Sequence, residues 1–265
     1  MRTRAPLLLL SSLLVATAGC ADDVQTGDDQ NITSHATEAE VKIAIGEADI
    51  DKVVDALGLS DAEPTKERDI YFYETPGLDL YEAGVILRAR SKHDDADDST
   101  VKIRPMESSR LDSAWFELDG FKCEIDRSPT SSVNACSLSV EQKEDEIEDV
   151  YEGARSIEKL FSDDQADFVE LGTEVDWGAL EVFGPIEARV YEVEVDELSA
   201  ELTVEHWILP DGSAMLELST RVKQSKADSA MTALEAVCEG LGADCSSDAE
   251  SKTRAALEYF AAEPY

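Results

Sequence analysis

Three charged side chains alternate with small or apolar ones near residue 40. Glu38, Glu40 and Lys42 lie two residues apart in the sequence. Because successive side chains of a β-strand point to opposite faces, the three charges share one face. Carboxylates are the ligands that hard divalent cations prefer, and a lysine ammonium attracts an anion. The spacing therefore indicates a polar face whose carboxylates could hold a cation and whose lysine could hold an anion.

Two later strand-like segments carry basic side chains on one face each. Arg88 and Arg90 share a face in the first, and Lys102 and Arg104 share a face in the second. Taken strand by strand, a charged face turned to water is the simpler interpretation. The chain, however, has 59 acidic and only 23 basic residues, so its water-facing surface should be mostly acidic. A β-barrel with a wet, charged interior and an apolar outer face would explain these basic faces.

The strong acidity excludes some classes of partner. The formal net charge is -36 over 265 residues. A nucleic acid would be repelled by this charge, and so would an anionic membrane surface. We therefore expect no nucleic-acid partner.

The N-terminus has the features of an export signal. Two arginines precede an apolar run, residues 7–15, that is too short to span a bilayer as a helix. The residues that follow end in Cys20 and resemble a bacterial lipobox, which implies cleavage before Cys20 and lipid attachment to its thiol. We expect residues 1–19 to be a lipoprotein signal peptide and residues 20–36 to be a flexible tether. An ordinary signal peptide cleaved near the same place is the alternative.

The other cysteines agree with export. Four remain besides Cys20, and an even number in an exported chain predicts two disulfides. Of the three possible connectivities we expect the local one, which joins Cys123 to Cys136 and Cys238 to Cys245. The protein is then expected to be exported and lipid-anchored to the cell envelope, on the periplasmic or outer-membrane face. The lipid would be its only contact with the membrane.

Apolar periodicity and turn residues outline the remaining elements. A helical period predicts an insertion over residues 140–170. Turn residues predict one hairpin within residues 115–127 and another within residues 202–222. Two helices should follow the second hairpin. Because we find no internal repeat and no interior linker, we expect residues 37–265 to form a single domain.

Four motifs follow one another along the chain: E-x-E-x-K at 38–42, D-I-Y-F-Y-E-T at 69–75, L-R-A-R at 87–90 and T-V-K-I-R at 100–104. Their order and spacing resemble the signature of the CYTH superfamily, the triphosphate tunnel metalloenzymes. The resemblance implies an α+β protein built on an eight-stranded antiparallel β-barrel tunnel, with helices packed on the outside. It also implies a triphosphate or polyphosphate ligand and Mg or Mn as cofactor.

The resemblance also assigns roles to single residues. Either Glu40 or Glu217 could activate the attacking water. The metal-binding carboxylates would be Glu38, Glu40 and Glu217, and the phosphate-binding residues would be Lys42, Arg88, Arg90, Lys102, Arg104 and Arg189. Arg221 is an additional basic candidate.

The functional expectation is metal-dependent hydrolysis of a triphosphate or short polyphosphate by a membrane-anchored lipoprotein. A lipoprotein that binds polyphosphate or another polyanion without turnover is the alternative. An adenylate cyclase is less expected, because ATP is scarce outside the cytoplasm. A structural lipoprotein with chance motifs is the third interpretation. The sequence leaves the oligomeric state open.

Overall fold

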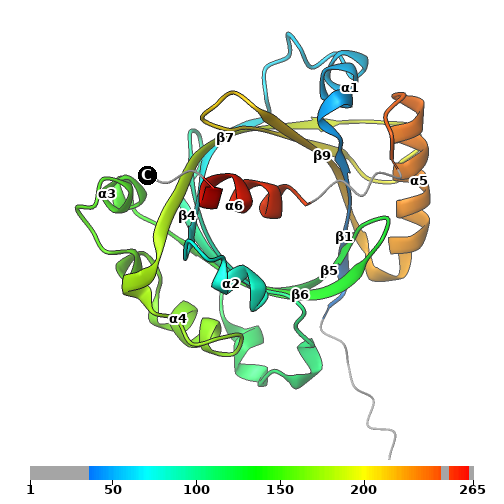
Figure 1. Ribbon diagram of the computed structural model, residues 1–265. Helices are drawn as coiled ribbons and strands as arrows, with labels where there is room; N and C mark the ends of the chain where they lie inside the picture. The colour runs from blue at the N-terminus through cyan, green and yellow to red at the C-terminus, as the bar shows by residue number, and fades with distance from the viewer. Residues whose placement is uncertain (1–35, 246–250, 263–265) are drawn as a thin grey trace, which may run out of the picture. The chain divides into compact units, whose positions relative to one another are not determined.

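A closed ring of β-strands forms the centre of the structure (Figure 1). The computed structural model describes residues 36–245 and 251–262. The strands are β1 (Glu38–Ile45), β2 (Lys66–Glu74), β3 (Val85–Lys92), β4 (Asp98–Ile103), β5 (Phe121–Arg127), β6 (Ser132–Glu141), β7 (Glu181–Val193), β8 (Leu202–Ile208) and β9 (Ala214–Lys223). Around the ring they follow the order β1-β5-β6-β4-β3-β2-β7-β8-β9.

The expected barrel is confirmed, but the expected eight strands are not, because the described part of the chain has nine. The ring closes where β1 lies between β9 and β5. The β1–β9 pair is antiparallel, whereas the β1–β5 pair is parallel. The barrel is therefore not antiparallel throughout, and the parallel pair places the charged faces of β1 and β5 side by side.

Two of the expected elements have different boundaries. The hairpin expected within residues 115–127 is wrong, because Ser113–Glu117 form a short 3-10 helix and β5 pairs instead with β6. The helix expected from residue 140 starts later, because β6 runs to Glu141. The hairpin within residues 202–222 is confirmed as the β8–β9 pair.

Short helices cover much of the outer face of the barrel (Figure 1). The α-helices are α1 (Ile50–Ala56), α2 (Asp79–Glu82), α3 (Glu146–Tyr151), α4 (Asp163–Glu170), α5 (Ala227–Gly240) and α6 (Lys252–Ala262). The 3-10 helices are η1 (Glu47–Asp49), η2 (Ser108–Arg110), η3 (Ser113–Glu117), η4 (Ile157–Leu160), η5 (Trp177–Ala179) and η6 (Gln224–Lys226). None of the described helices has both the length and the apolar character needed to cross a membrane.

The outer helices pack on the apolar faces of the strands. Met231 and Leu234 of α5 belong to a buried cluster with Val41 and Ile43 of β1. On these strands the apolar side chains point outward under the helices, so the alternating charged side chains point into the barrel. In these strands the apolar residues therefore face outward, where they form the hydrophobic core with the helices, and the charged residues face the interior of the barrel.

The last helix differs from the expectation that all helices pack outside. In Figure 1, α6 lies within the ring of strands. Leu257 and Phe260 of α6 are buried in a cluster with Phe72, Ile86 and Trp207, whose side chains face the interior of the barrel. One sector of the barrel interior is therefore filled by apolar side chains of α6.

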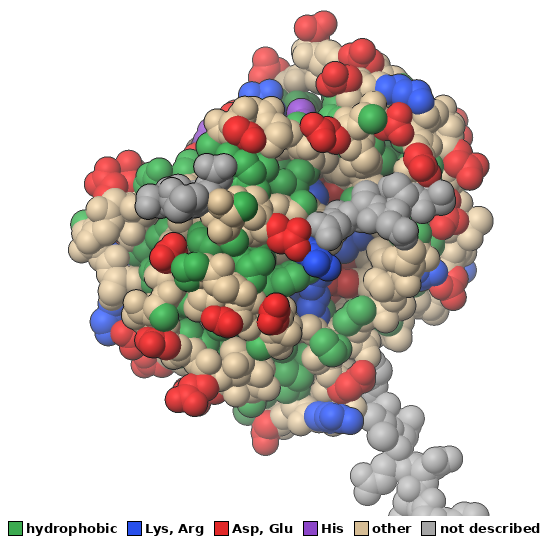
Figure 2. Space-filling view, in the orientation of Figure 1, with side chains coloured by type: hydrophobic (Ala, Val, Ile, Leu, Met, Phe, Trp, Pro, Cys, Tyr) green, Lys and Arg blue, Asp and Glu red, His purple; other side chains and the backbone are tan. Residues whose placement is uncertain are grey.

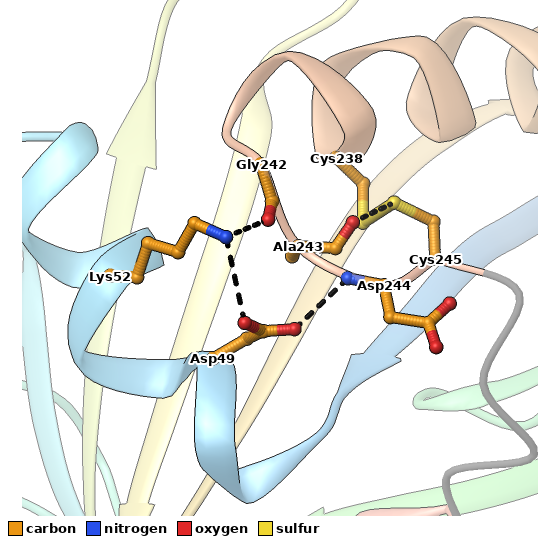
Figure 3. The surroundings of a disulfide bond; sticks show 7 residues. All are labelled: Asp49, Lys52, Cys238, Gly242, Ala243, Asp244 and Cys245. Atoms are coloured by element: carbon orange, nitrogen blue, oxygen red, sulfur yellow. Dashed lines mark hydrogen bonds and ion pairs between the residues drawn. A yellow bond between two sulfur atoms is a disulfide. The ribbon is translucent and has the colours of Figure 1, made fainter.

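Both expected disulfides are present. Cys123 joins Cys136 across the β5–β6 pair, and Cys238 joins Cys245 at the end of α5. Two hydrogen bonds also hold the turn between Cys238 and Cys245, as Figure 3 shows. Lys52 of α1 donates to the Gly242 carbonyl, and Asp49, which precedes α1, accepts from the Asp244 amide. The turn after α5 is therefore fixed to α1.

The expectations for the N-terminus fall largely outside the described residues. The signal peptide, Cys20 and all of the tether except residue 36 lie there. Ala36 is described and is buried in the core, so it belongs to the folded domain rather than to the tether.

Candidate functional site: a charged cavity inside the barrel

The interior of the barrel contains a cavity of about 570 Å³ lined mainly by charged side chains. Ten of the chain's 23 basic residues line it, against six of the 59 acidic residues. Figure 2 shows Lys and Arg side chains at the bottom of a hollow on this face. The basic lining residues are Lys42, Lys66, Arg68, Arg88, Arg90, Lys102, Arg104, Lys122, Arg221 and Lys252.

The cavity brings together most of the residues expected from sequence. Those that line it are Glu40, Lys42, Arg88, Arg90, Lys102, Arg104 and Glu217, together with Arg221. They come from four strands, β1, β3, β4 and β9, and from the loop that follows β4. The spatial convergence that the sequence analysis required is therefore present.

Two expected site residues lie elsewhere. Arg189 is on the outer face of β7, where its side chain is 40% exposed and pairs with Glu187 at 2.5 Å. The next residue, Val190, points into the barrel and lines the cavity. Because neighbouring residues of a strand point to opposite faces, Arg189 points outward. Glu38 is exposed at the end of β1, opposite Lys223, and does not line the cavity.

Three carboxylates inside the barrel are close enough to hold one metal ion. Glu40 of β1 and Glu124 and Asp126 of β5 each offer one oxygen, and these oxygens lie within 4.8 Å of one another. The parallel β1–β5 pairing brings them together, because Glu124 lies opposite Glu38 and Asp126 lies opposite Glu40. Carboxylate oxygens suit a hard divalent cation, so the three residues could serve as its ligands.

Basic side chains contact each of these carboxylates. Asp126 lies 2.8 Å from the Lys102 ammonium, and Glu124 lies 2.9 Å from the Arg221 guanidinium. Arg221 also bridges to Glu40 at 2.8 Å. Burial by itself would raise the pKa of Glu40, but Lys42 and Arg221 beside it lower the pKa to about 2. Glu40 is therefore an anion throughout the neutral range.

Lys42 lies between carboxylates from several strands. Burial would lower its pKa, but Glu217, Glu40 and Asp126 surround it and raise the pKa above the ordinary value. The Lys42 ammonium lies 3.5 Å from Glu40 and 4.0 Å from Asp126. The charge on Lys42 is thus permanent at any physiological pH.

Arg88 differs from its basic neighbours in having no carboxylate partner. Arg90 pairs with Asp98 at 2.9 Å, but none of the described carboxylates lies within 4 Å of the Arg88 guanidinium. Its Nε atom is buried and has no hydrogen-bond partner in the described part of the chain. Burial, together with Arg90 and Arg68, lowers the pKa of Arg88 to about 9. An unpaired buried guanidinium is costly, which is the condition that a bound anion would relieve.

Sequence reasoning missed part of this site. Lys122, Glu124 and Asp126 could be seen to share a face, but nothing in the sequence indicated that β5 pairs with β1. The second group missed is on β8 and α6, where Glu205 and Lys252 line the cavity. Glu205 alternates with apolar residues in the same way as Glu40, so that signal was available.

Comparison with known proteins supports the fold. No family model matches the chain, and no curated protein sequence matches it. Among solved structures, a candidate adenylate cyclase from Bacillus halodurans is similar with a TM-score of 0.54 and 13% identity, over 84% of this chain and 98% of that one. A candidate adenylyl cyclase from Hippeastrum, described as having a dominant triphosphatase activity, has a TM-score of 0.55 and 15% identity, over 84% and 96%.

At these identities the likeness concerns the fold alone. What the chain shares with these two structures is a closed β-barrel with helices around it. The activity named for the Hippeastrum protein belongs to that protein.

Proposed function

We propose that this protein hydrolyses the terminal phosphoanhydride bond of a triphosphate or short polyphosphate, with a divalent cation such as Mg or Mn. The observation that supports this most is the Arg88 guanidinium, which has no partner among the described carboxylates and lies in a cavity lined by ten basic residues. A chain of phosphates presents several anionic oxygens in a row, and an array of basic side chains along a barrel matches that shape. Arg offers a planar fork to phosphate oxygens, and Lys acts as a point charge.

The carboxylates Glu40, Glu124 and Asp126 are proposed as the metal ligands. When bound there, a divalent cation would neutralise phosphate oxygens and lower the pKa of a bound water. Glu40 suits the role of ligand better than that of general base. Its pKa of about 2 makes it a weak proton acceptor at neutral pH.

The basic side chains around these carboxylates would change partners on binding. In the structure Lys102 and Arg221 neutralise Asp126 and Glu124. An incoming phosphate chain would draw these side chains to itself and leave the carboxylate oxygens for the metal. The lining would then neutralise charge that develops on the phosphates in the transition state, which is the main protein contribution to phosphoryl transfer.

One observation favours binding without turnover as the second candidate. Each of the three carboxylates is already paired with a basic side chain, so these carboxylates are neutralised without a metal. A polyanion could then be held by the remaining basic residues alone. The phosphate-binding role of Arg88 is common to both candidates.

Phosphate release distinguishes the two. The purified protein is incubated with tripolyphosphate, with Mn²⁺, with Mg²⁺ or with a chelator, and released phosphate is measured. Metal-dependent release that disappears in Asp126→Asn and persists in the exposed control Asp61→Asn supports the hydrolase. If no phosphate is released but tripolyphosphate raises the melting temperature, the binder is supported. Conversion of ATP to a cyclic nucleotide would contradict both.

We also propose that the mature chain is exported and anchored through a lipid on Cys20. The two disulfides support this, because they form and persist in oxidising compartments. Metabolic labelling with a fatty acid should label the protein, and Cys20→Ser should abolish the label and release the protein from the membrane fraction. An unlabelled membrane-bound protein would contradict the proposal.

A further inference from the structure

Two carboxylates that are not among the proposed metal ligands face each other inside the barrel. Glu205 of β8 lies directly opposite Glu217 of β9, and both side chains point into the cavity. Like charges directly opposite on neighbouring strands destabilise a sheet unless something neutralises them. The pair therefore requires a cation between the two carboxylates.

The cation in that position is the ammonium of Lys252, at the start of α6. It lies 2.5 Å from a Glu205 oxygen and 3.3 Å from a Glu217 oxygen. The same ammonium lies 4.6 Å from the centre of the Trp207 ring, which adds a cation–π contact. The Lys252 side chain is only 6% exposed, so these partners have replaced most of its water.

Lys252 is held in place by the helix that bears it. Leu257 and Phe260 are buried among the apolar side chains of the barrel interior, as described above. To remove the ammonium from the two carboxylates, α6 would have to move or the side chain would have to bend away from Glu205 and Trp207. Arg68 contributes a second positive charge at Glu205. Lys252 and Arg68 therefore neutralise the two carboxylates, and Lys42 adds a further positive charge beside Glu217.

We propose that Lys252 is a built-in cation that takes the place of a metal ion between Glu205 and Glu217. The barrel would then admit a divalent cation only at Glu40, Glu124 and Asp126, and Glu217 would be a partner of Lys252 rather than a metal ligand. The expectation of one metal ion in the wild-type barrel rests on the proposed function, because that ion would bind at Glu40, Glu124 and Asp126. The role of Lys252 does not depend on the proposed function.

The two carboxylate groups differ in what neutralises them. The group on β1 and β5 is neutralised by long side chains of strands, such as Lys102 and Arg221, which can turn toward an arriving phosphate. The pair on β8 and β9 is neutralised by a residue whose helix is packed into the barrel. A divalent ion that joined Lys252 there would add two positive charges to carboxylates that are already neutralised, at a high cost in a buried site.

The test counts bound Mn²⁺ in the wild type and in Lys252→Met, by equilibrium dialysis against Mn²⁺ alone. Methionine keeps the length and apolar contacts of the lysine and removes its charge. We expect Lys252→Met to bind one ion more than the wild type, and to gain a larger rise in melting temperature from Mn²⁺. The matched control Lys226→Met, on the exposed η6, should bind the wild-type number.

The difference between the two proteins is the measured quantity, so the result does not depend on the proposed function. If the wild type binds no ion and Lys252→Met binds one, the site at Glu40 fails and the role of Lys252 stands. Equal numbers in a folded Lys252→Met would overturn the proposal.

Should Lys252→Met fail to fold, Glu217→Gln in the otherwise wild-type chain decides. The proposal expects the number of bound Mn²⁺ ions to be unchanged and their affinity to change less than about threefold. The loss of an ion, or an affinity at least tenfold weaker, would make Glu217 a ligand and overturn it.

Discussion

Replacement of Arg88 by methionine should raise the stability of the free protein while it weakens phosphate binding. The cost of the buried charge can be bounded from its pKa, which falls from 12.5 to about 9. These values differ by about 3.5, which at about 1.4 kcal/mol for each pKa unit sets a ceiling of about 5 kcal/mol. Because the guanidinium faces a wet cavity, we expect about 1–2 kcal/mol of this in practice.

Although Arg88→Met should make the free protein more stable, it should bind tripolyphosphate more weakly than the wild type. A hydrogen bond to a charged group contributes about 1.5–3 kcal/mol. At 1.4 kcal/mol for each factor of ten, loss of the Arg88 contact should raise the Kd for tripolyphosphate by roughly 10- to 100-fold. Urea denaturation gives the first quantity, and calorimetric titration without metal gives the second.

Arg189→Met is the matched control, because Arg189 is exposed on the outer face of β7. It should change stability by less than about 0.5 kcal/mol and leave the Kd unchanged. The reasoning would be refuted if Arg88→Met lost more than about 1 kcal/mol of stability without ligand, or if it bound tripolyphosphate as tightly as the control.

Three further predictions concern metal, pH and covalent stability. Glu124→Gln should weaken Mn²⁺ binding in the presence of tripolyphosphate by at least about tenfold, and an unchanged titration would remove Glu124 from the ligand set. Because the folded-state pKa of Glu40 is about 2, below its ordinary value of 4.5, its contribution to stability is complete above about pH 5 and is lost as the pH falls toward 2. Unfolding free energies measured in urea from pH 7 to pH 2.5 should therefore fall, and a flat profile would contradict the ion-pair network. The double variant Cys123→Ala and Cys136→Ala should lose about 2–3 kcal/mol, because the disulfide closes a short loop in the unfolded chain. A denaturation midpoint equal to that of the wild type would show that the bond does not constrain the unfolded state.

The strands that could be predicted are those with a strict two-residue period. In β3 the alternation of Arg88 and Arg90 with apolar residues marked both the strand and its charged face, and the structure agrees. By contrast, β6 (Ser132–Glu141) is rich in serine and was not expected as a strand. Its pairing with β4 and β5 compensates for a weak local preference.

The errors in the site have two physical causes. Face assignment requires knowledge of which side of a strand meets the core, so Arg189 could be placed on a common face with Glu187 but not inside or outside the barrel. The residues of β5 that pair with β1 are 86 positions farther along the chain, and no local pattern indicates such a pair. For the same reason, the sequence predicted a helix near the end of the chain but did not indicate that this helix lies within the ring.

The distribution of charge between the cavity and the rest of the chain has a consequence for kinetics. The lining residues sum to +4, ten basic against six acidic, so the remaining residues of a chain of net charge -36 sum to -40. A polyphosphate that diffuses to within about 8 Å of the outer surface, the screening length at physiological ionic strength, is therefore repelled there and is attracted only at the opening of the cavity. Added salt should speed its arrival, whereas salt slows the arrival of an anion at a basic surface.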